Sequence, residues 1–172
     1  MSKAVCFDPQ MTENCRILVL GSMPGKISLA QNQYYAHPRN NFWPIMARIF
    51  NFSDKLTYSE KLDTLNQAGV GLWDVIATCY REGSLDTAIQ TKDLVVNDFK
   101  TCFERFPKVE RVLLNGQKAG QLFKQKVAVP LMLTDRKIDW LVLPSTSPAH
   151  ASVKFEEKLF KWQQACNFKQ ST

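Results

Sequence analysis

The sequence lacks the features of several protein classes. None of its apolar runs reaches the 18 residues of a membrane-spanning helix, and the first 15 residues hold Asp8, Pro9 and Glu13 rather than the apolar core of a signal peptide. The five cysteines are odd in number and contain no Cys-x-x-Cys pair, which argues against a disulfide framework and against a zinc or iron–sulfur site. We therefore expect a soluble cytoplasmic protein without a metal or other cofactor.

The 172 residues also lack a linker, an internal repeat and a low-complexity segment. Hydrophobic residues make up 45% of the chain and charged residues 22%, a composition that can bury a core and is unlike that of disordered proteins. We expect residues 1–172 to form a single domain and a monomer. Lysine and arginine number 22 against 16 acidic residues, and this net charge of +6 is compatible with a polyanionic partner without requiring one.

Apolar patterns of two kinds alternate along the chain. Continuous apolar runs predict strands at 16–20, 71–77, 110–114, 127–133 and 140–143. Helical spacing predicts helices at 41–52, 58–67, 97–103, 117–125 and 153–167, and the polar segment 81–93 is expected to be a loop. Strands that alternate with helices indicate an α/β fold, a three-layer α/β/α sandwich around a mostly parallel sheet of about four strands.

Three loops at the ends of these strands are candidates for a functional site, namely 21–25, 72–77 and 144–150. The carboxyl ends of parallel strands meet at one edge of a sheet, so these loops are expected to share a cleft. The first loop leads into residues 34–43, which combine aromatic rings with the amides of Asn40 and Asn41. Rings that stack on bases beside amides that bond base edges or hold a water suit nucleobase chemistry.

Five blocks in this order resemble the uracil-DNA glycosylase superfamily: GSMPG at 21–25, YYAHPRNNFW at 34–43, GLWDV at 71–75, LLNG at 113–116 and LPSTSPA at 143–149. The chain is most similar to its DNA-deoxyinosine (hypoxanthine-DNA) glycosylase branch, and next to the mismatch-specific uracil/thymine-DNA glycosylases. The resemblance implies an enzyme that flips a deaminated base out of DNA, hypoxanthine first and uracil second, and hydrolyses its glycosidic bond. Two alternatives stay open: a module of this fold that binds DNA or a nucleotide without cutting, and, ranked last, a nucleotide-binding fold.

The resemblance also implies which residues act. Other branches carry an Asp or Asn where this chain has Met23, so the water-holding group is expected to be Asn40, with Asn41 as the alternative. Asp74 stands where relatives read the base edge, and Leu143 stands where several branches carry a histidine that stabilises the departing base. The implied substrate-binding residues are Gly21, Ser22, Met23, Pro24, Gly25, Tyr35, Phe42 and Asp74. The implied DNA contacts are Arg39, Ser145, Thr146, Ser147, Pro148 and His150.

Several of these residues also have ordinary structural explanations. Trp43 is expected in the core, and Asp74 could cap a turn or pair with Arg81. His37 could brace its loop as readily as act as an acid or base. Asn115, which precedes a glycine, is expected to serve a turn rather than contact a base.

Overall fold

A parallel sheet of four strands forms the centre of the molecule in the computed structural model, which describes residues 2–167. The strand order is β3 (Val70–Asp74), β2 (Ile17–Gly21), β6 (Arg111–Asn115) and β7 (Asp139–Leu143). Val19 of β2 lies beside Leu72 of β3 and Leu113 of β6. Every residue of β2 and β3 is buried, which is why these strands read as continuous apolar runs.

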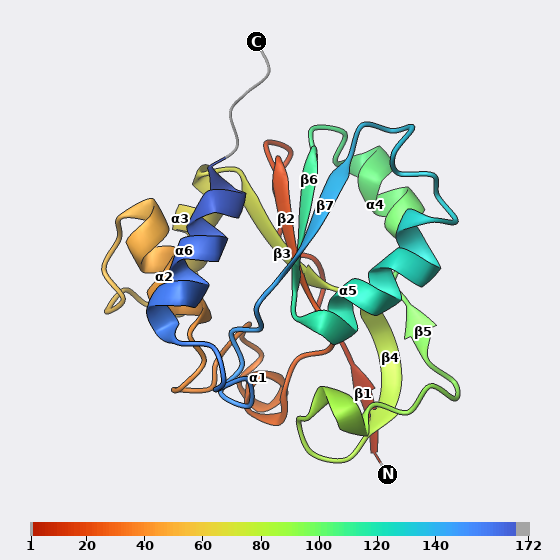
Figure 1. Cartoon of the computed structure of the whole chain (residues 1–172), viewed down its shortest axis with the longest axis horizontal. Helices are drawn as coiled ribbons and strands as arrows, with labels where there is room; N and C mark the ends of the chain where they lie inside the picture. Colours follow the sequence, from red (N-terminus) through yellow and green to blue (C-terminus); the bar gives the residue numbers. More distant parts are fainter. Residues whose placement is uncertain (1, 168–172) are drawn as a thin grey trace.

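Helices cover both faces of this sheet, as Figure 1 shows. Helices α2 (Phe42–Phe50), α3 (Tyr58–Gln67) and α6 (Phe155–Cys166) pack on one face, where Val19 and Leu113 point. Helices α4 (Phe99–Arg105) and α5 (Gln117–Phe123) pack on the other, where Leu18 and Leu114 point. Because alternate strand residues face opposite sides, one strand supplies both cores, and the expected α/β/α sandwich is confirmed.

The predicted strand 71–77 is wrong in its extent, because the chain changes sheet within it. It leaves the parallel sheet after Asp74, and β4 (Ile76–Arg81) pairs with β1 (Ser2–Val5) and β5 (Val95–Val96) in a small antiparallel sheet. Val75 at the junction is fully buried and its N–H donates to the Gly21 carbonyl. A run that is apolar throughout gives no sign of such a break.

The strand predicted at 127–133 is also wrong. Residues Lys124–Ala128 extend helix α5 as a π-helical turn, η2, and turns follow as far as Lys137. Val127, Ala128 and Leu133 are buried, whereas Val129 and Met132 are each 66% exposed, which is a helical distribution rather than an alternating one. Pro130 supplies no N–H for a sheet, so the apolar composition of this segment was misleading.

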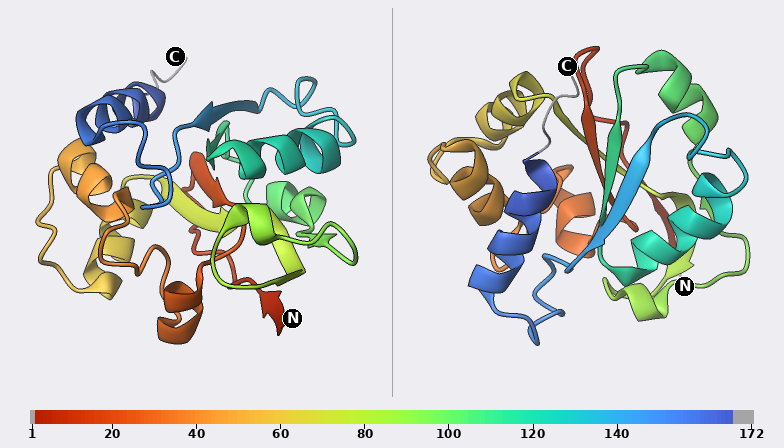
Figure 2. Two further views of the ribbon diagram at one scale, coloured as in Figure 1. Left: turned by 60° about the horizontal axis from the view of Figure 1, so that its bottom comes forward. Right: turned by 45° about the horizontal axis from the view of Figure 1, so that its top comes forward.

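Two short elements absent from the predictions lie at the carboxyl ends of the strands. Helix α1 (Lys26–Gln31) follows the first loop, and a 3₁₀ turn, η1 (Asp86–Ala88), interrupts the segment predicted as loop. Figure 2 brings this end of the sheet forward in its left view, where α1, η1 and the chain between β7 and α6 surround the strand ends. The three predicted loops therefore do meet at one edge of the sheet.

Candidate active site

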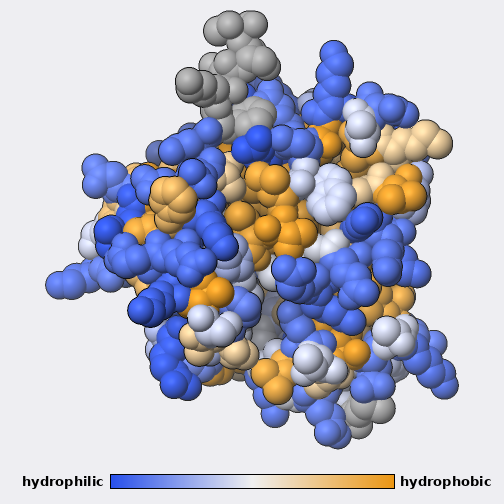
Figure 3. Space-filling view, viewed as in Figure 1, coloured by the Kyte–Doolittle hydropathy of each residue, from blue (hydrophilic) through white to orange (hydrophobic). Residues whose placement is uncertain are grey.

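A cavity of about 1470 Å³ opens at the carboxyl ends of the parallel strands. Its lining includes most of the predicted site residues: Gly21, Ser22, Met23, Pro24, Gly25, Tyr35, Asn40, Asp74, Ser145, Thr146, Ser147, Pro148 and His150. The cavity continues along β7, where Leu141 and Val142 are partly exposed, and apolar side chains gather over this strand between the two groups of helices (Figure 3). Arg39, Asn41 and Phe42 do not line it.

The first loop is held in shape by contacts from a distant segment. The Arg81 guanidinium donates to the main-chain carbonyls of Met23 and Pro24, and the Ser22 hydroxyl donates to the Asp86 carboxylate. The main-chain N–H of Lys26 donates to the Ser84 hydroxyl oxygen at 2.8 Å. Arg81 therefore fixes the loop carbonyls, and the segment that carries Asp86 closes one side of the cavity.

Close approach within the loop occurs at Gly21 rather than at Gly25. A Cβ on Gly21 would lie 2.8 Å from Asp74 Oδ1, too close to be accommodated without a shift. A Cβ on Gly25 would meet Ser84 at an ordinary 3.5 Å. Glycine at position 21 thus lets the Asp74 carboxyl sit directly against the main chain of the loop.

Asp74 is an unusual acid because its side chain is buried in the floor of the cavity. The residue is 3% exposed, and its Oδ2 atom has no hydrogen-bond partner. Burial raises the pKa of Asp74 from 3.8 to about 8, because removal from water disfavours the charged form; Asp86 adds to the rise and Arg81 opposes it. Burial thus favours the protonated form of the carboxyl, which donates as well as accepts hydrogen bonds.

Phe42 lies behind Tyr35 rather than at the cavity surface, which differs from the expectation that its ring faces a base. The two rings stack with centroids 3.9 Å apart and an interplanar angle of 26°. Phe42 is fully buried, and Trp162 packs edge-on against its ring. Trp43 is in the core as predicted, and its indole N–H donates to the Tyr34 carbonyl.

The two candidate asparagines have different surroundings. Asn40 lines the cavity, and its side-chain oxygen accepts a 2.9 Å hydrogen bond from the Phe42 N–H at the start of α2. Asn41 lies outside the lining, and its main-chain N–H donates to the Thr146 carbonyl. His37 braces the loop, because its Nδ1 accepts from the Arg39 N–H at 3.0 Å. An amide oxygen that accepts one bond keeps a second lone pair, so Asn40 remains able to bind water.

The Thr146 side chain contradicts its expected role as a phosphate contact. Thr146 is fully buried, and its hydroxyl oxygen accepts from the Asn115 amide at 2.9 Å. The Asn115 side-chain oxygen in turn accepts from the Thr146 N–H. Asn115 thus joins the end of β6 to the loop after β7, a longer-range task than the turn that its sequence position suggested.

The loop after β7 is anchored from helix α6. The buried Lys158 ammonium donates to the His150 carbonyl at 2.7 Å, and the Trp162 indole N–H donates to the Pro144 carbonyl at 3.0 Å. Within the loop, the hydroxyl oxygens of Ser145 and Ser147 accept from main-chain N–H groups two residues later. Both serines therefore shape the loop, and both line the cavity.

Comparisons with known proteins agree with this arrangement. Residues 9–169 match the family model described as the uracil DNA glycosylase superfamily. The chain belongs to this superfamily. It is 40% identical over 116 residues to a hypoxanthine DNA glycosylase of Methanosarcina barkeri, covering 67% of this chain and 72% of that protein. It is 38% identical over 146 residues to a hypoxanthine DNA glycosylase of Methanosarcina acetivorans, covering 84% and 86% respectively.

A solved structure also resembles this member of the superfamily. It is a solution NMR structure of a Methanosarcina acetivorans protein described as a candidate uracil DNA glycosylase, with a TM-score of 0.80 and 33% identity. The match covers 96% of this chain and 97% of that one. The expected activity class is therefore confirmed: the protein is a DNA glycosylase, and its substrate is DNA.

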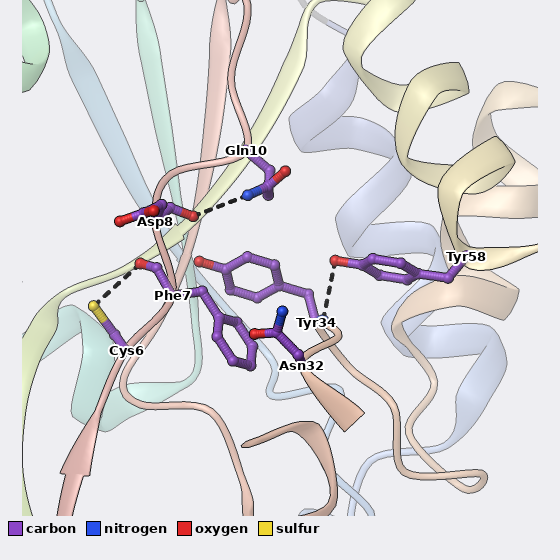
Figure 4. Close-up of a pocket in the computed structure, with 7 residues that line it drawn as sticks. All are labelled: Cys6, Phe7, Asp8, Gln10, Asn32, Tyr34 and Tyr58. Atoms are coloured by element: carbon purple, nitrogen blue, oxygen red, sulfur yellow. Dashed lines mark hydrogen bonds between the residues drawn. The ribbon is translucent and has the colours of Figure 1, made fainter. Parts of the chain in front are cut away.

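The glycosylase has a second, smaller cavity of about 430 Å³, and Tyr34 lines both cavities. Figure 4 shows how the Tyr34 N–H points at the Tyr58 hydroxyl, which accepts its hydrogen bond, and how Phe7 packs against the Tyr34 ring. Over the described residues 2–167, no helix is long and apolar enough to cross a membrane. In the same residues no three His, Cys, Asp or Glu side chains gather as metal ligands.

The sequence analysis did not predict three of the residues that line the cavity of this glycosylase as site residues. Ser84 and Asp86 belong to a segment interpreted only as a polar loop, and Asn115 was assigned to a turn. The sequence did offer a reason to place Asn115 in the site, because Asn115 ends a buried strand as Asp74 does. No sequence feature indicated that Ser84 and Asp86 belong to the site, because nothing local in the sequence relates them to the first loop.

Proposed function

We propose that this glycosylase removes hypoxanthine from deoxyinosine in DNA by hydrolysis and leaves an abasic site. The protonated Asp74 carboxyl carries the proposal, because one face of a neutral carboxylic acid both accepts and donates. Hypoxanthine, like uracil, presents an N–H donor beside a carbonyl acceptor on its pairing edge, so Asp74 suits a deaminated base and the relatives favour hypoxanthine among these. An ionised Asp74 would repel that carbonyl oxygen. The similarity to two hypoxanthine DNA glycosylases supports the same substrate.

Asn40 is proposed to hold the attacking water. It is favoured over Asn41 because it lines the cavity, and the lone pair left free by the Phe42 N–H can orient a water toward C1′. An amide is not a general base, so it assists by position and electrostatics. The base must first leave the duplex, at a cost that is smaller for the weakly paired hypoxanthine–thymine pair. Arg39 and the hydroxyls of Ser145 and Ser147 are proposed to contact DNA.

An excision assay tests both proposals. Labelled duplexes with a single inosine or a single uracil are incubated with the enzyme, and hot alkali then cuts any abasic site. We expect strand cleavage at inosine only after alkali, since a purely hydrolytic enzyme leaves the strand intact. Cleavage at uracil alone would contradict the assignment to hypoxanthine and move the protein toward the uracil-specific branches.

The Asn40→Ala variant should lose about a hundredfold or more in the single-turnover rate, because the water is no longer positioned. Asn41→Ala is the matched control and should retain most of the rate. Because the Asn40 side chain also accepts from the Phe42 N–H at the start of α2, Asn40→Ser should be compared, as its hydroxyl can still accept this bond. An unchanged rate in Asn40→Ala, or the larger loss in Asn41→Ala, would refute the assignment.

A further inference from the structure

Tyr34 lines both cavities, and its contacts fix the ring in place. Its N–H donates to the Tyr58 hydroxyl oxygen at 3.2 Å, and its carbonyl accepts from the Trp43 indole N–H at 3.0 Å. The Phe7 ring packs edge-on against the Tyr34 ring, with the two centroids 5.0 Å apart. Tyr34 is 2% exposed, and its hydroxyl points away from Tyr58 (Figure 4). The packing of the core therefore sets the position of this hydroxyl.

The Tyr34 hydroxyl lies beside the carboxyl of Asp74. Burial raises the pKa of Asp74 to about 8, and hydrogen bonding to Tyr34 opposes that rise. Burial, and then Asp74, raise the pKa of Tyr34 well above its ordinary value, so the hydroxyl keeps its proton and can donate. Neither the Tyr34 hydroxyl nor Asp74 Oδ2 has a hydrogen-bond partner of good geometry. Because one group is a donor and the other an acceptor, a small rotation of the carboxyl lets them satisfy each other.

The main chain of Asp74 is fixed more firmly than its carboxyl. The Asp74 carbonyl accepts from the Asn97 side-chain amide at 2.8 Å, and Asp74 lies beside Gly21 of the neighbouring strand β2. Gly21 gives the carboxyl room, but it has no side chain that could bond to the carboxyl and hold its plane. An acid that reads a base must present its proton and its carbonyl oxygen in the plane of that base. A donor fixed by the core, such as the Tyr34 hydroxyl, can set this plane.

We propose that Tyr34 is a positioning residue for the reading of the base: its hydroxyl donates to the Asp74 carboxyl and holds that group in the plane of the pairing edge. This inference rests on the proposed function, in which Asp74 reads a deaminated base. Tyr34 acts through Asp74, which keeps its own proton and a free lone pair for the base. The same bond favours the ionised carboxyl, so Tyr34 also sets the pH above which Asp74 ceases to donate.

Titration of Asp74 in the free enzyme tests this contact without reference to activity. Carboxyl-carbon NMR of isotope-labelled enzyme follows Asp74 in the wild type, Tyr34→Phe and Tyr80→Phe, with Asp74→Asn to assign the signal. Tyr34→Phe should raise the pKa of Asp74 by about half a pH unit or more, because a bond that stabilises the ionised form is lost. Tyr80→Phe, the same change on β4 outside both cavity linings, should match the wild type. The other ionisable groups around Asp74 are identical in these proteins: Cys6, Tyr35, Arg81 and Asp86.

Single-turnover excision of inosine tests the positioning itself. At pH 6 a pKa of about 8 keeps Asp74 largely neutral, and Tyr34→Phe should then excise about tenfold more slowly than the wild type. The rate of Tyr34→Phe should also begin to fall at a higher pH than that of the wild type, which a purely structural defect would not cause. Tyr80→Phe should keep both the wild-type rate and the wild-type pH profile.

An unchanged or lowered pKa of Asp74 in Tyr34→Phe would overturn the proposal, and so would an unchanged excision rate at pH 6. If none of the proteins excises inosine, the proposed function fails, whereas the NMR titration still decides whether Tyr34 holds Asp74. If Tyr34→Phe does not fold, the ζ-carbon signal of Tyr34 in the wild type decides. This signal should move with the same midpoint as Asp74 and should not do so in Asp74→Asn; a signal that does not follow Asp74 in the wild type refutes the contact.

Discussion

At the scale of single residues, Asp74 links the stability of the protein to its function. Its carboxyl is buried against Gly21, one oxygen has no partner, and its pKa is raised to about 8. Unpartnered buried groups are uncommon in folded proteins because they lose their bonds to water. Their presence at the floor of the cavity is understandable if a ligand supplies the missing partner.

The raised pKa of Asp74 predicts a specific pH dependence of stability. The folded protein keeps a proton that the unfolded chain releases above its ordinary pKa of 3.8, so this residue favours folding at low pH. As pH rises from about 4 to 8, the free energy of unfolding should fall by up to about 1.4 kcal/mol per pH unit through this group. Asp74→Asn should lack this slope and exceed the wild type in stability above pH 7. Urea unfolding at pH 5, 6, 7 and 8 measures the difference between the two proteins.

Asp63→Asn is the control for this comparison, because Asp63 is an exposed acid of helix α3. It should follow the wild-type profile at every pH. Parallel profiles for wild type and Asp74→Asn would show that the Asp74 carboxyl is already ionised at pH 5, and would remove the basis for its role as a donor.

At the scale of elements, helix α6 acts as the anchor of the loop after β7. Lys158 and Trp162 each donate to a carbonyl of that loop, and Trp162 also packs against Phe42. Both donors come from the buried side of the helix, although Lys158 is a residue type that is seldom fully buried. The helix therefore connects the core around Phe42 to the loop proposed to contact DNA.

Replacing Lys158 by methionine should separate these two tasks. Lys158→Met keeps a long apolar stem in the core but loses the donor to the His150 carbonyl, so the loop should loosen while the helix stays packed. We expect KM for an inosine duplex to rise about tenfold with kcat little changed and Tm unchanged or higher. Steady-state kinetics and thermal melting measure both quantities. Gln163→Met, a substitution at an exposed position of the same helix, should leave KM and Tm unaffected. An unchanged KM in Lys158→Met would mean that the loop does not depend on the Lys158 hydrogen bond.

At the scale of the whole molecule, the net charge of +6 suits a polyanionic substrate. The structure places little of this charge in the floor of the cavity, where the Asp74 carboxyl is held in its neutral form, and the acidic Asp86 lines one side. Positive side chains such as Lys26, Lys118 and Lys161 lie elsewhere in its lining. The positive lining residues suit a phosphate backbone, and the neutral floor at Asp74 suits an uncharged base.

This distribution predicts a salt-dependent affinity for DNA. The logarithm of the binding constant for a duplex should fall linearly with the logarithm of salt concentration, with a slope of about −0.9 for each phosphate contacted. Arg39→Gln should reduce the magnitude of this slope by about one if Arg39 contacts a phosphate. Lys100→Gln, on helix α4 and paired with Glu104, should leave the slope unchanged. Fluorescence anisotropy between 50 and 200 mM salt measures the slope, and equal slopes for Arg39→Gln and the wild type would exclude that contact.

The sequence by itself determined the sheet, its helices and the superfamily. The strands at Ile17–Gly21 and Arg111–Asn115 are buried on both faces, so continuous apolar runs mark them in the sequence. Four of the five ordered blocks lie at the ends of strands, and the block at 34–43 leads into α2. It did not reveal the break at Val75 or the helical turn at Lys124–Ala128, since apolar composition alone does not distinguish a strand from a buried turn. That residues 1–172 form one domain and act as a monomer stays a prediction.

Only the tertiary structure decided how the site residues relate to one another. In the structure Phe42 lies behind Tyr35, and the buried Thr146 hydroxyl is hydrogen-bonded to Asn115. Asp74 lies beside Gly21, and its Oδ2 atom has no hydrogen-bond partner. The burial of Thr146 and the shifted pKa of Asp74 arise from neighbours dozens of residues away in sequence, which no local pattern encodes. The types of chemical group in the site are fixed by the sequence, but their protonation and their accessibility are properties of the fold, because both depend on how much water the packing excludes.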